Sequence, residues 1–214
     1  WELSVLMGYE TGKNRLECVG DVEESADLIA YYCDQMESHQ GFVTRMGSLG
    51  SNEENLSVLR SYGVWAVISP FNFPLALAAG PAGGALVAGN TVVFKPADLV
   101  PGCAWAIADI LARAGVPAGV FNLVMGRGSV VGELLSTDPG IDAVSFTGSV
   151  ITGKRVAANC AARLAKVQLE MGGKNPLVVL DDADLDTAVN VSVQSAFFST
   201  GQRCTAASRL IVTE

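Results

Sequence analysis

The sequence predicts an α/β protein built on a doubly wound parallel sheet. Short runs of continuous hydrophobic residues alternate along the chain with segments of helical periodicity, a pattern typical of parallel strands covered by helices on both faces. Of the 214 residues 50% are hydrophobic and 17% are charged, against about 25% charged residues in an ordinary soluble domain. From Ser61 to Phe94 there is no Asp, Glu, Lys, Arg or His, so most of this segment is expected to be buried.

The amino-terminal part is predicted to be helical, and its clearest amphipathic helix runs from Val22 to Ser38. Apolar side chains from Ala26 to Cys33 recur at helical spacing. Glu23 and Glu24 would lie in the first turn, where the helix dipole favours negative charge. We expect this helix to lie on the surface of the domain.

The alternating blocks follow this helix. Strands are predicted at 63–69, 91–95, 120–125, 143–148, 165–170, 176–181 and 208–213, and helices between them at 75–88, 102–115, 130–136, 152–162 and 184–197. The helix at 102–115 has a clear end, because Gly115 is followed closely by Pro117. In a doubly wound sheet ligands bind beyond the carboxyl ends of the strands, so the residues that follow each strand are the candidates for a site.

The uncharged run at 61–94 raises the question of a membrane span, because about 18 consecutive apolar residues can form a transmembrane helix. Here Pro70, Pro74 and Pro81, the pair at 83–84 and two asparagines interrupt the run. No 18-residue window is therefore both continuous and compatible with a helix. The sequence predicts no membrane partner.

Charge and cysteine usage exclude several other classes. The formal net charge is -8 and no basic block could follow a phosphate backbone, so nucleic acid is not an expected partner. The five cysteines form no C-x-x-C motif and there is a single histidine, His39, which argues against a disulfide scaffold and against a zinc site. We expect no metal ligands. No secretory signal is recognisable at the start, and the cysteine usage fits a reducing compartment, so we expect a cytoplasmic protein.

Two glycine-containing turns are candidates for binding a phosphate group. Gly126, Gly128 and Gly132 resemble a dinucleotide fingerprint, but position 131 is Val where the motif needs glycine, which favours a plain turn from strand to helix. The second candidate is the turn from Phe146 to Gly153, with a serine at a helix start. It is either an anion cradle made of free backbone N–H groups or a simple helix cap.

A nucleophilic cysteine in this chain would have to be activated by a helix end, a cation or a carboxylate base, because almost no histidine is available. His39 is predicted to lie on a solvated helix end, which excludes most catalytic triads. Cys204 lies in a polar, glycine-containing turn at 199–205 and is either a reactive thiol or an ordinary turn residue. Cys33, Cys103 and Cys160 are predicted within helices, where we expect them to pack as small hydrophobic side chains.

Three further polar residues follow predicted strands or stand in a stiff loop. Glu170 ends a strand before a glycine pair and is either a cap for the turn or a general base. Lys95 is the first charge after the uncharged run and is either a surface lysine or a ligand contact at a strand end. Asn72, in a loop rich in Pro and Phe, could donate its amide hydrogen to an oxyanion.

Taken together, these residues resemble the aldehyde dehydrogenase superfamily over essentially the whole chain. The motifs are SPFNFPL at 69–75, VVFKPAD at 92–98, SFTGS at 145–149, QLEMGGKNP at 168–176 and FSTGQRCTAASRLIV at 198–212. From Lys95 onward they are most similar to α-ketoglutarate semialdehyde (2,5-dioxopentanoate) dehydrogenases. Before that point YYCDQMES and SPFNFPLALAAGPAGGALVAGN look more like dehydrogenases of the glutamate-semialdehyde (pyrroline-5-carboxylate) kind.

This resemblance implies catalytic roles for three of the candidate residues. Cys204 matches the nucleophile that attacks the aldehyde to give a thiohemiacetal, and Asn72 matches the oxyanion hole together with the backbone N–H of Cys204. After hydride transfer a thioester remains, and Glu170 matches the base that activates water to release the acid. The implied reaction is oxidation of a small aldehyde, such as the semialdehyde 2,5-dioxopentanoate, to the carboxylic acid, without a metal.

The resemblance also implies an NAD or NADP cofactor. Lys95 matches the lysine that holds the adenosine ribose, and Asp98 lies where an acidic residue often contacts the ribose hydroxyls. A carboxylate there would repel a 2′-phosphate, so NAD is favoured over NADP. The positions expected to bind cofactor are Ile68, Ser69, Pro70, Phe71, Lys95, Asp98, Gly128, Phe146, Gly148, Ser149, Gly153 and Gly172.

The chain is less than half as long as members of this family, so it looks truncated. We expect an NAD(P)-binding domain of the Rossmann type at 1–170 and only the start of the catalytic domain, with the nucleophile, at 171–214. The resemblance implies a homo-oligomer. Two hypotheses remain: an active aldehyde dehydrogenase, or a cofactor-binding or structural segment of one without independent turnover.

Overall fold

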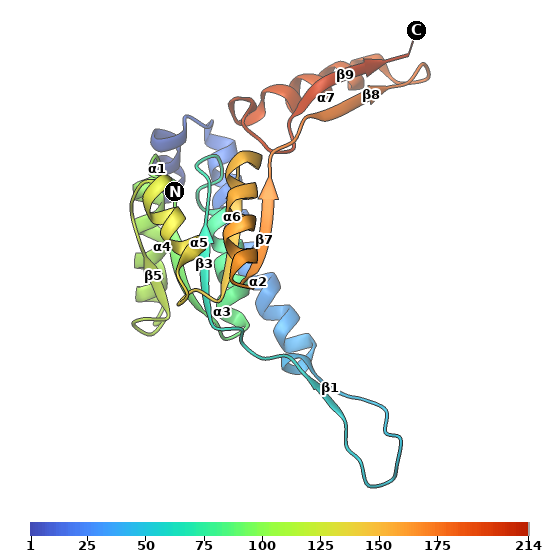
Figure 1. Ribbon diagram of the computed structural model, residues 1–214. Coiled ribbons are helices and arrows are strands. Elements are labelled where there is room, and N and C mark those ends of the chain that lie inside the picture. The colour runs from blue at the N-terminus through green and yellow to red at the C-terminus, as the bar shows by residue number, and fades with distance from the viewer. Residues whose placement is uncertain (214) are drawn as a thin grey trace.

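The computed structural model describes residues 1–213 and has a five-stranded parallel sheet at its centre, with helices on both sides (Figure 1). The helices are α1 (Glu2–Thr11), α2 (Arg15–Ser38), α3 (Ala76–Val87), α4 (Pro101–Arg113), α5 (Glu133–Thr137), α6 (Val150–Ala162) and α7 (Leu185–Phe197). The strands are β1 (Val43–Arg45), β2 (Leu56–Val58), β3 (Val64–Ile68), β4 (Thr91–Lys95), β5 (Phe121–Leu123), β6 (Ala143–Gly148), β7 (Lys166–Met171), β8 (Asn175–Val179) and β9 (Ala207–Val212). The predicted doubly wound α/β fold is confirmed.

The order of strands across the central sheet is β5-β4-β3-β6-β7, and all four pairings are parallel. The first strand to enter this sheet, β3, lies in the middle. The next two, β4 and β5, lie successively further out on one side, and β6 lies on the other side of β3. The direction of winding therefore reverses between β3 and β6. This reversal is the topological switch point, where doubly wound sheets leave a crevice for a ligand.

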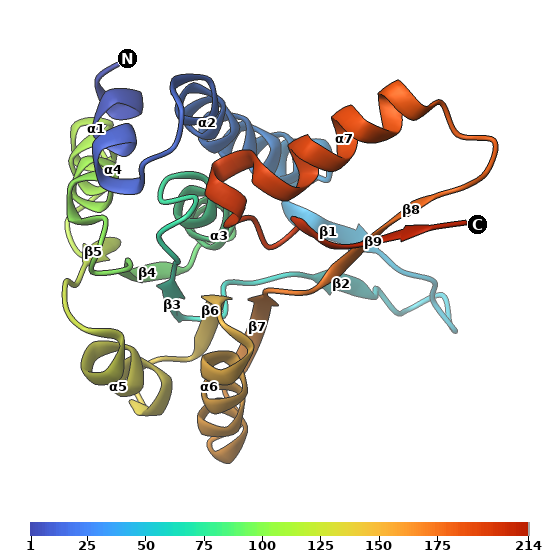
Figure 2. The same cartoon turned by 90° about the horizontal axis from the view of Figure 1, so that it is seen from above.

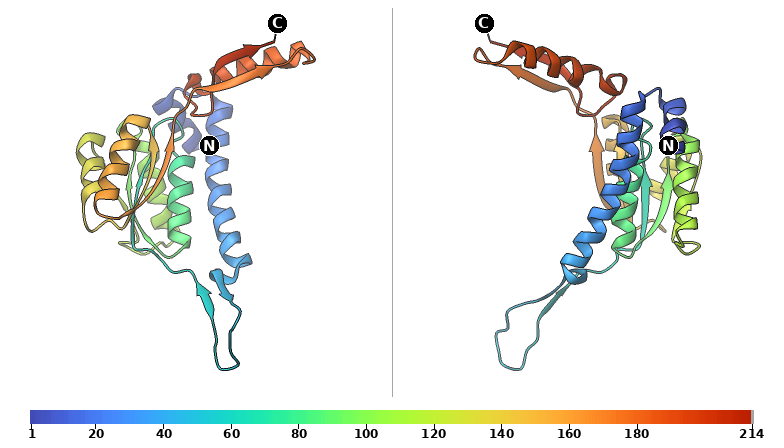
Figure 3. Two further views of the ribbon diagram at one scale, coloured as in Figure 1. Left: turned by 45° about the vertical axis from the view of Figure 1, so that its right-hand side comes forward. Right: turned by 180° about the vertical axis from the view of Figure 1, so that it is seen from behind.

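Two apolar clusters, one on each face, hold the sheet between its helices. Val67, Val92 and Phe94 pack with buried side chains of α1 to α4 on one face. Ala66, Ile68 and Val144 pack with Val156 and Cys160 of α6 on the other face. Neighbouring β3 residues thus point to opposite clusters, so both faces of the strand are covered, as Figure 3 shows from two sides. This explains why the segment 61–94 has no charge.

Helix α2 begins at Arg15 and not at the predicted Val22. Its amino terminus is a capping box: the Asn14 side chain accepts a hydrogen bond from the N–H of Glu17 at 3.0 Å, and the Glu17 carboxylate accepts one from the N–H of Asn14 at 3.4 Å. The prediction that Glu23 and Glu24 lie in the first turn is therefore wrong. They are exposed residues of the third turn, and Glu17 is the acidic residue of the first turn.

Two parts of the chain lie outside the central sheet. The antiparallel pair β1 and β2, which was not predicted, extends from the end of α2 as an exposed hairpin (Figure 1). Beyond β7, the strands β8 and β9 form a separate parallel pair with α7 beside them. Figure 2 shows this pair projecting from the end of the sheet at which β7 terminates.

The cysteines and the shorter helices differ in part from the predictions. Cys103 and Cys160 are buried in helices as predicted, but Cys33 is exposed, because it lies on the solvent side of α2. The predicted helix at 130–136 is a π-helical turn at Gly128–Gly132 followed by the short α5. His39 caps α2 and is exposed, stacked on Phe42 with ring centroids 4.8 Å apart. Within residues 1–213, no helix is both long and apolar enough to span a membrane.

Candidate active site

A cavity of about 840 Å³ opens at the carboxyl ends of the strands, where the sheet reverses its winding. Its lining combines the three predicted catalytic residues with most of the predicted cofactor positions: Asn72, Glu170, Cys204, Ile68, Ser69, Pro70, Phe71, Lys95, Asp98, Gly128, Phe146, Gly148, Ser149 and Gly172. Gly153 is the one predicted cofactor position that does not line the cavity; it packs against Met171 and Phe146. Residues up to 136 positions apart in the sequence lie around this one cavity, as the doubly wound topology predicts.

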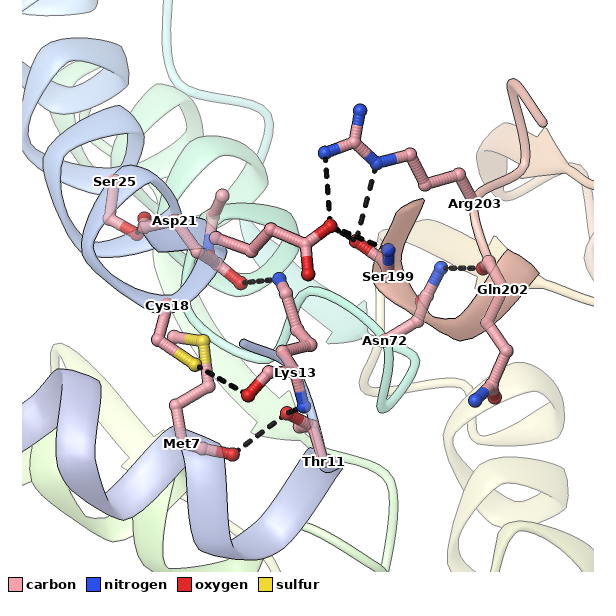
Figure 4. A network of polar contacts seen from close by, with 12 residues as sticks. Met7, Thr11, Lys13, Cys18, Asp21, Ser25, Asn72, Ser199, Gln202 and Arg203 are labelled. Carbon is pink, nitrogen blue, oxygen red and sulfur yellow. Dashed lines mark hydrogen bonds and ion pairs between the residues drawn. The ribbon is translucent and has the colours of Figure 1, made fainter. Parts of the chain in front are cut away.

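The loop after β3 carries Asn72 to the rim of the cavity. Pro70 and Pro74 limit the backbone on either side, and the amide nitrogen Nδ2 of Asn72 donates a hydrogen bond of 2.7 Å to the carbonyl oxygen of Gln202. Figure 4 shows this amide directed at Gln202. The bond connects the loop after β3 with the turn that precedes Cys204.

Cys204 lies in an irregular turn between α7 and β9. Ser199 and Thr200 have positive φ angles of 50° and 56°, and Gly201 follows with 70°, so three consecutive residues adopt the left-handed conformation that side chains disfavour. The carbonyl oxygen of Cys204 accepts a hydrogen bond of 2.8 Å from the Asn175 side chain, and the Cys204 side chain is solvent-accessible at the cavity. The turn thus places an exposed cysteine at the cavity.

Lys95 ends β4 as a buried cation, with only 2% of its surface exposed. Its Nζ donates to the neighbouring carbonyl oxygen of Pro96, and no ion pair of Lys95 is found in the described part of the chain. Burial lowers the pKa of this ammonium below its usual 10.5, partly offset by the negative charge of Asp98. A buried cation without a carboxylate in contact is suited to hydrogen-bonding a polar ligand in the cavity.

The turn between β6 and α6 forms the opposite wall. The Ser149 hydroxyl accepts a hydrogen bond of 3.2 Å from the N–H of Thr152, so the serine caps the helix. A helix cap was one of the two predictions for this turn, and an anion cradle was the other. The glycines on either side allow close packing: a Cβ on Gly148 would lie 2.6 Å from Phe146, and one on Gly153 would lie 2.5 Å from the sulfur of Met171. Gly148, Ser149 and Thr152 of this turn line the cavity.

The glycine turn at 126–132, whose spacing departs from the dinucleotide fingerprint, also lies beside the cavity. Gly126 has a φ of 150°, and a Cβ there would lie 2.5 Å from Val131, so the turn is shaped around the valine that breaks the motif. Gly128 and Gly132 line the cavity. Nearby, Arg155 of α6 pairs with Glu133 of α5 at 2.8 Å.

Glu170 is the penultimate residue of β7, opposite Thr147 of β6 in the parallel register. Its carboxylate is exposed and lines the cavity together with Gly172. It faces the same space as the thiol of Cys204, although the two residues belong to different sheets.

Sequence reasoning missed a second set of polar residues, located behind this site. Glu17 of α2 accepts hydrogen bonds from the N–H and the hydroxyl of Ser199 at 2.5 and 3.0 Å. Lys13 and Asp21 form a buried ion pair at 2.9 Å. The capping-box spacing of Asn14 and Glu17 could have placed the start of α2 correctly. No signal in the sequence indicates that Glu17 contacts Ser199, 182 positions away.

The fold and the cavity define a class of protein: a doubly wound α/β domain whose switch-point cavity is shared by a thiol, a carboxylate and a side-chain amide. The chain belongs to the aldehyde dehydrogenase family, whose family model matches residues 1–214. The predicted resemblance is confirmed.

Individual relatives agree with this assignment. The chain is 44% identical over 212 residues to the α-ketoglutaric semialdehyde dehydrogenase of Bacillus subtilis. It is 40% identical over 211 residues to the succinate-semialdehyde dehydrogenase [NADP(+)] GabD of Escherichia coli. Each alignment covers 99% of this chain and 43% of the relative. The structure of betaine aldehyde dehydrogenase from Staphylococcus aureus in complex with NAD+ matches with a TM-score of 0.94 at 32% identity, covering 99% of this chain and 42% of that one. The chain thus spans a little under half the length of the relatives it matches.

Proposed function

We propose that the chain carries the thiol, the oxyanion hole and the cofactor site of an NAD(P)-dependent aldehyde dehydrogenase. The observation that carries this proposal is the hydrogen bond of 2.7 Å from Asn72 to the carbonyl of Gln202. This bond holds the Asn72 amide against Gln202, which lies two positions before Cys204 in the sequence. Asn72, Cys204 and Glu170 all line the same cavity. Family membership supports the same chemistry.

In the proposed reaction the thiolate of Cys204 attacks the aldehyde carbon. The carbonyl oxygen becomes an oxyanion, which accepts hydrogen bonds from the Asn72 amide and from the backbone N–H of Cys204. When bound, the nicotinamide supplies a hydride acceptor, and loss of hydride from the thiohemiacetal leaves a thioester on Cys204. Glu170 then removes a proton from water, which attacks the thioester and releases the carboxylic acid and the thiol.

The residues around the cavity fit a dinucleotide. Lys95 is a buried donor without a carboxylate partner, suited to a ribose hydroxyl. The start of α6 at Gly148 and Ser149 lines the cavity and is suited to a pyrophosphate. Asp98 lines the same cavity. Its carboxylate would accept a hydrogen bond from a ribose hydroxyl, and its negative charge would repel a 2′-phosphate. We therefore propose NAD as the preferred cofactor.

For the substrate we propose a small semialdehyde, with 2,5-dioxopentanoate as the first candidate. The support is the 44% identity to an α-ketoglutaric semialdehyde dehydrogenase and the similarity of the motifs after Lys95. We further propose that residues 1–170 form the NAD(P)-binding domain and 171–214 the beginning of a catalytic domain, in a cytoplasmic homo-oligomer.

The second candidate function is cofactor binding without turnover by these 214 residues. The observation that favours it is the surface of α7, β8 and β9, where large apolar side chains such as Val178, Val189 and Ile211 are exposed. Exposed apolar surface of this extent is typical of a face that another segment or chain covers. The proposed cofactor site, in contrast, is formed by the carboxyl ends of the central strands and the loops that follow them.

The roles of Cys204 and Glu170 are tested by rapid mixing of the chain with NAD and 2,5-dioxopentanoate. Glu170→Gln should retain a burst of reduced cofactor but lose steady turnover, because the thioester forms and is not hydrolysed. Cys204→Ala should lose both. Cys33→Ala and Glu23→Gln are matched controls, since both side chains are exposed on α2. The assignment is wrong if both site variants retain burst and turnover.

The same assay separates the two candidate functions. Steady NADH production by the 214-residue chain that Cys204→Ala abolishes would exclude binding without turnover. Parallel assays with NADP and succinic semialdehyde test the cofactor and substrate preferences, and the solution mass tests the homo-oligomer.

A further inference from the structure

The first turn of α2 contacts the turn that carries Cys204. The Oε1 atom of Glu17 accepts hydrogen bonds from the backbone N–H of Ser199 at 2.5 Å and from its hydroxyl at 3.0 Å, and it lies 3.7 Å from the Arg203 guanidinium. Arg203 also donates to the Ser199 hydroxyl at 3.2 Å. The Glu17 side chain is only 5% exposed, so these contacts are shielded from water.

The next turn of the same helix contacts the loop that carries Asn72. One carboxylate oxygen of Asp21 accepts a hydrogen bond of 2.8 Å from the N–H of Ala76, at the start of α3. The other oxygen pairs with Lys13, whose Nζ lies 3.8 Å from the centre of the Phe73 ring. Figure 4 shows Lys13 and Asp21 on one side of this network and Ser199 and Arg203 on the other.

We propose that Glu17 is a positioning residue that fixes the turn at 199–203 so that the backbone N–H of Cys204 and the amide of Asn72 converge on the same oxygen. The inference rests on the proposed function, because it assigns Glu17 a role in the oxyanion hole formed by Cys204 and Asn72. Glu17 is not among the residues that line the cavity, so its role is to act through Ser199.

The backbone of the turn explains why an external contact is needed. Ser199 and Thr200 are non-glycine residues with φ near +50°, a conformation that persists only where surrounding contacts enforce it. Two of these contacts, both to Ser199, come from the Glu17 carboxylate, which also lies 3.7 Å from the Arg203 guanidinium. Because α2 is also bound to the Asn72 loop through Asp21, one rigid helix aligns both donors of the oxyanion hole.

Two variants separate the positioning role from a role in folding. Glu17→Gln keeps the side-chain shape, an acceptor oxygen and the capping box, but it removes the charge that attracts Arg203. Glu17→Ala removes every contact. Glu24→Gln and Glu24→Ala are the matched controls, since Glu24 is exposed on the same helix. Alkylation of the buried Cys103 and Cys160 reports on loss of the fold.

The first measurement is hydrogen exchange of the backbone amides at 199–204 in the 214-residue chain. Glu17→Ala should accelerate exchange there by about ten-fold or more, the effect of losing a hydrogen bond to a charged acceptor, and Glu17→Gln should have a smaller effect. The Glu24 variants should match the wild type. Unchanged exchange in Glu17→Ala would overturn the proposal, independently of any aldehyde or cofactor.

The second measurement is protection of Cys204 from iodoacetamide by 2,5-dioxopentanoate, read by peptide mass spectrometry with the exposed Cys33 as internal reference. The aldehyde concentration giving half protection should rise about ten-fold in Glu17→Ala and less in Glu17→Gln, while cofactor binding is unchanged. If Asn72→Ala raises this concentration and Glu17→Ala does not, the positioning role is refuted. If the wild type is not protected, the proposed function fails and the oxyanion-hole role of Glu17 fails with it, while hydrogen exchange still decides whether Glu17 fixes the turn at 199–203.

Discussion

The amide nitrogen of Asn72 lies 2.7 Å from the carbonyl oxygen of Gln202, although 130 positions separate the two residues in the sequence. The first belongs to the loop after the central strand β3, and the second to the turn between α7 and β9. This bond connects the loop that carries one donor of the proposed oxyanion hole with the turn that precedes the other, the backbone N–H of Cys204.

Replacing Asn72 should therefore affect the chemical step more than binding. Asn72→Ala removes a donor to the oxyanion and the bond to Gln202, so we expect the burst of reduced cofactor to slow by about 10²–10³-fold, as for loss of one oxyanion-hole donor. The dissociation constant for NAD, measured by fluorescence titration, should change little. Asn122→Ala is the control, because Asn122 lies on β5, away from the cavity lining. An equal slowing in both variants would contradict the role of Asn72.

The buried charge of Lys95 should lower the free energy of unfolding of the cofactor-free chain, while the same residue contributes to cofactor binding. Because its ammonium is buried without a carboxylate contact, Lys95→Met should raise the free energy of unfolding of the cofactor-free chain by roughly 0.5–2 kcal/mol, a size common for stabilising substitutions at functional positions. NAD affinity should fall at the same time. Both are measured by denaturant unfolding with and without NAD.

The stability difference should also depend on pH. The pKa of Lys95 is lowered in the folded state, so the folded chain resists protonation, and the cost of the charge is complete below the folded pKa. As the pH rises through the folded pKa toward 10.5, the wild type should approach the variant in stability. A difference that widens with pH would show that burial of Lys95 is not the cause.

Breaking the buried pair of Lys13 and Asp21 should strongly destabilise the chain. Lys13→Met leaves the Asp21 carboxylate buried without its cation, for which a loss of about 3–5 kcal/mol is expected in urea unfolding. Arg113→Met is the comparison, because its pair with Asp109 is largely exposed and should contribute under about 1 kcal/mol. Similar losses in the two variants would show that burial of the first pair has little energetic effect.

Gly153 should be needed for packing behind the cofactor site and not for backbone freedom. A Cβ at this position would meet the Met171 sulfur at 2.5 Å, so Gly153→Ala must displace the Met171 side chain beside Glu170 and Gly172. We expect a folded variant with weaker NAD binding in calorimetric titration. Gly20→Ala in α2 has open space around it and should stabilise the chain by about 0.5–1 kcal/mol. Unchanged NAD affinity in Gly153→Ala would remove this position from the cofactor site.

Much of the architecture could be predicted because it depends on local patterns. The uncharged segment at 61–94 became β3, α3 and β4, since a strand buried on both faces requires continuous apolar residues. The residues after the strands could be placed around one cavity from the topology alone. The hairpin of β1 and β2 was missed because its strands are fully exposed and only three residues long, too short for an alternation of apolar and polar residues to be recognised.

The sequence by itself determined the parallel sheet, the position of the cavity and the residues with reactive side chains, because hydrophobic periodicity and the order of motifs along the chain contain that information. Only the tertiary structure decided how the site is held together. Glu17 and Ser199 are 182 positions apart, and neither residue is unusual in its local context. Their contact exists because α2, packed on α3, places a buried carboxylate beside a turn whose backbone conformation needs an external acceptor. Side-chain contacts of that kind follow from packing in three dimensions, which no local pattern encodes.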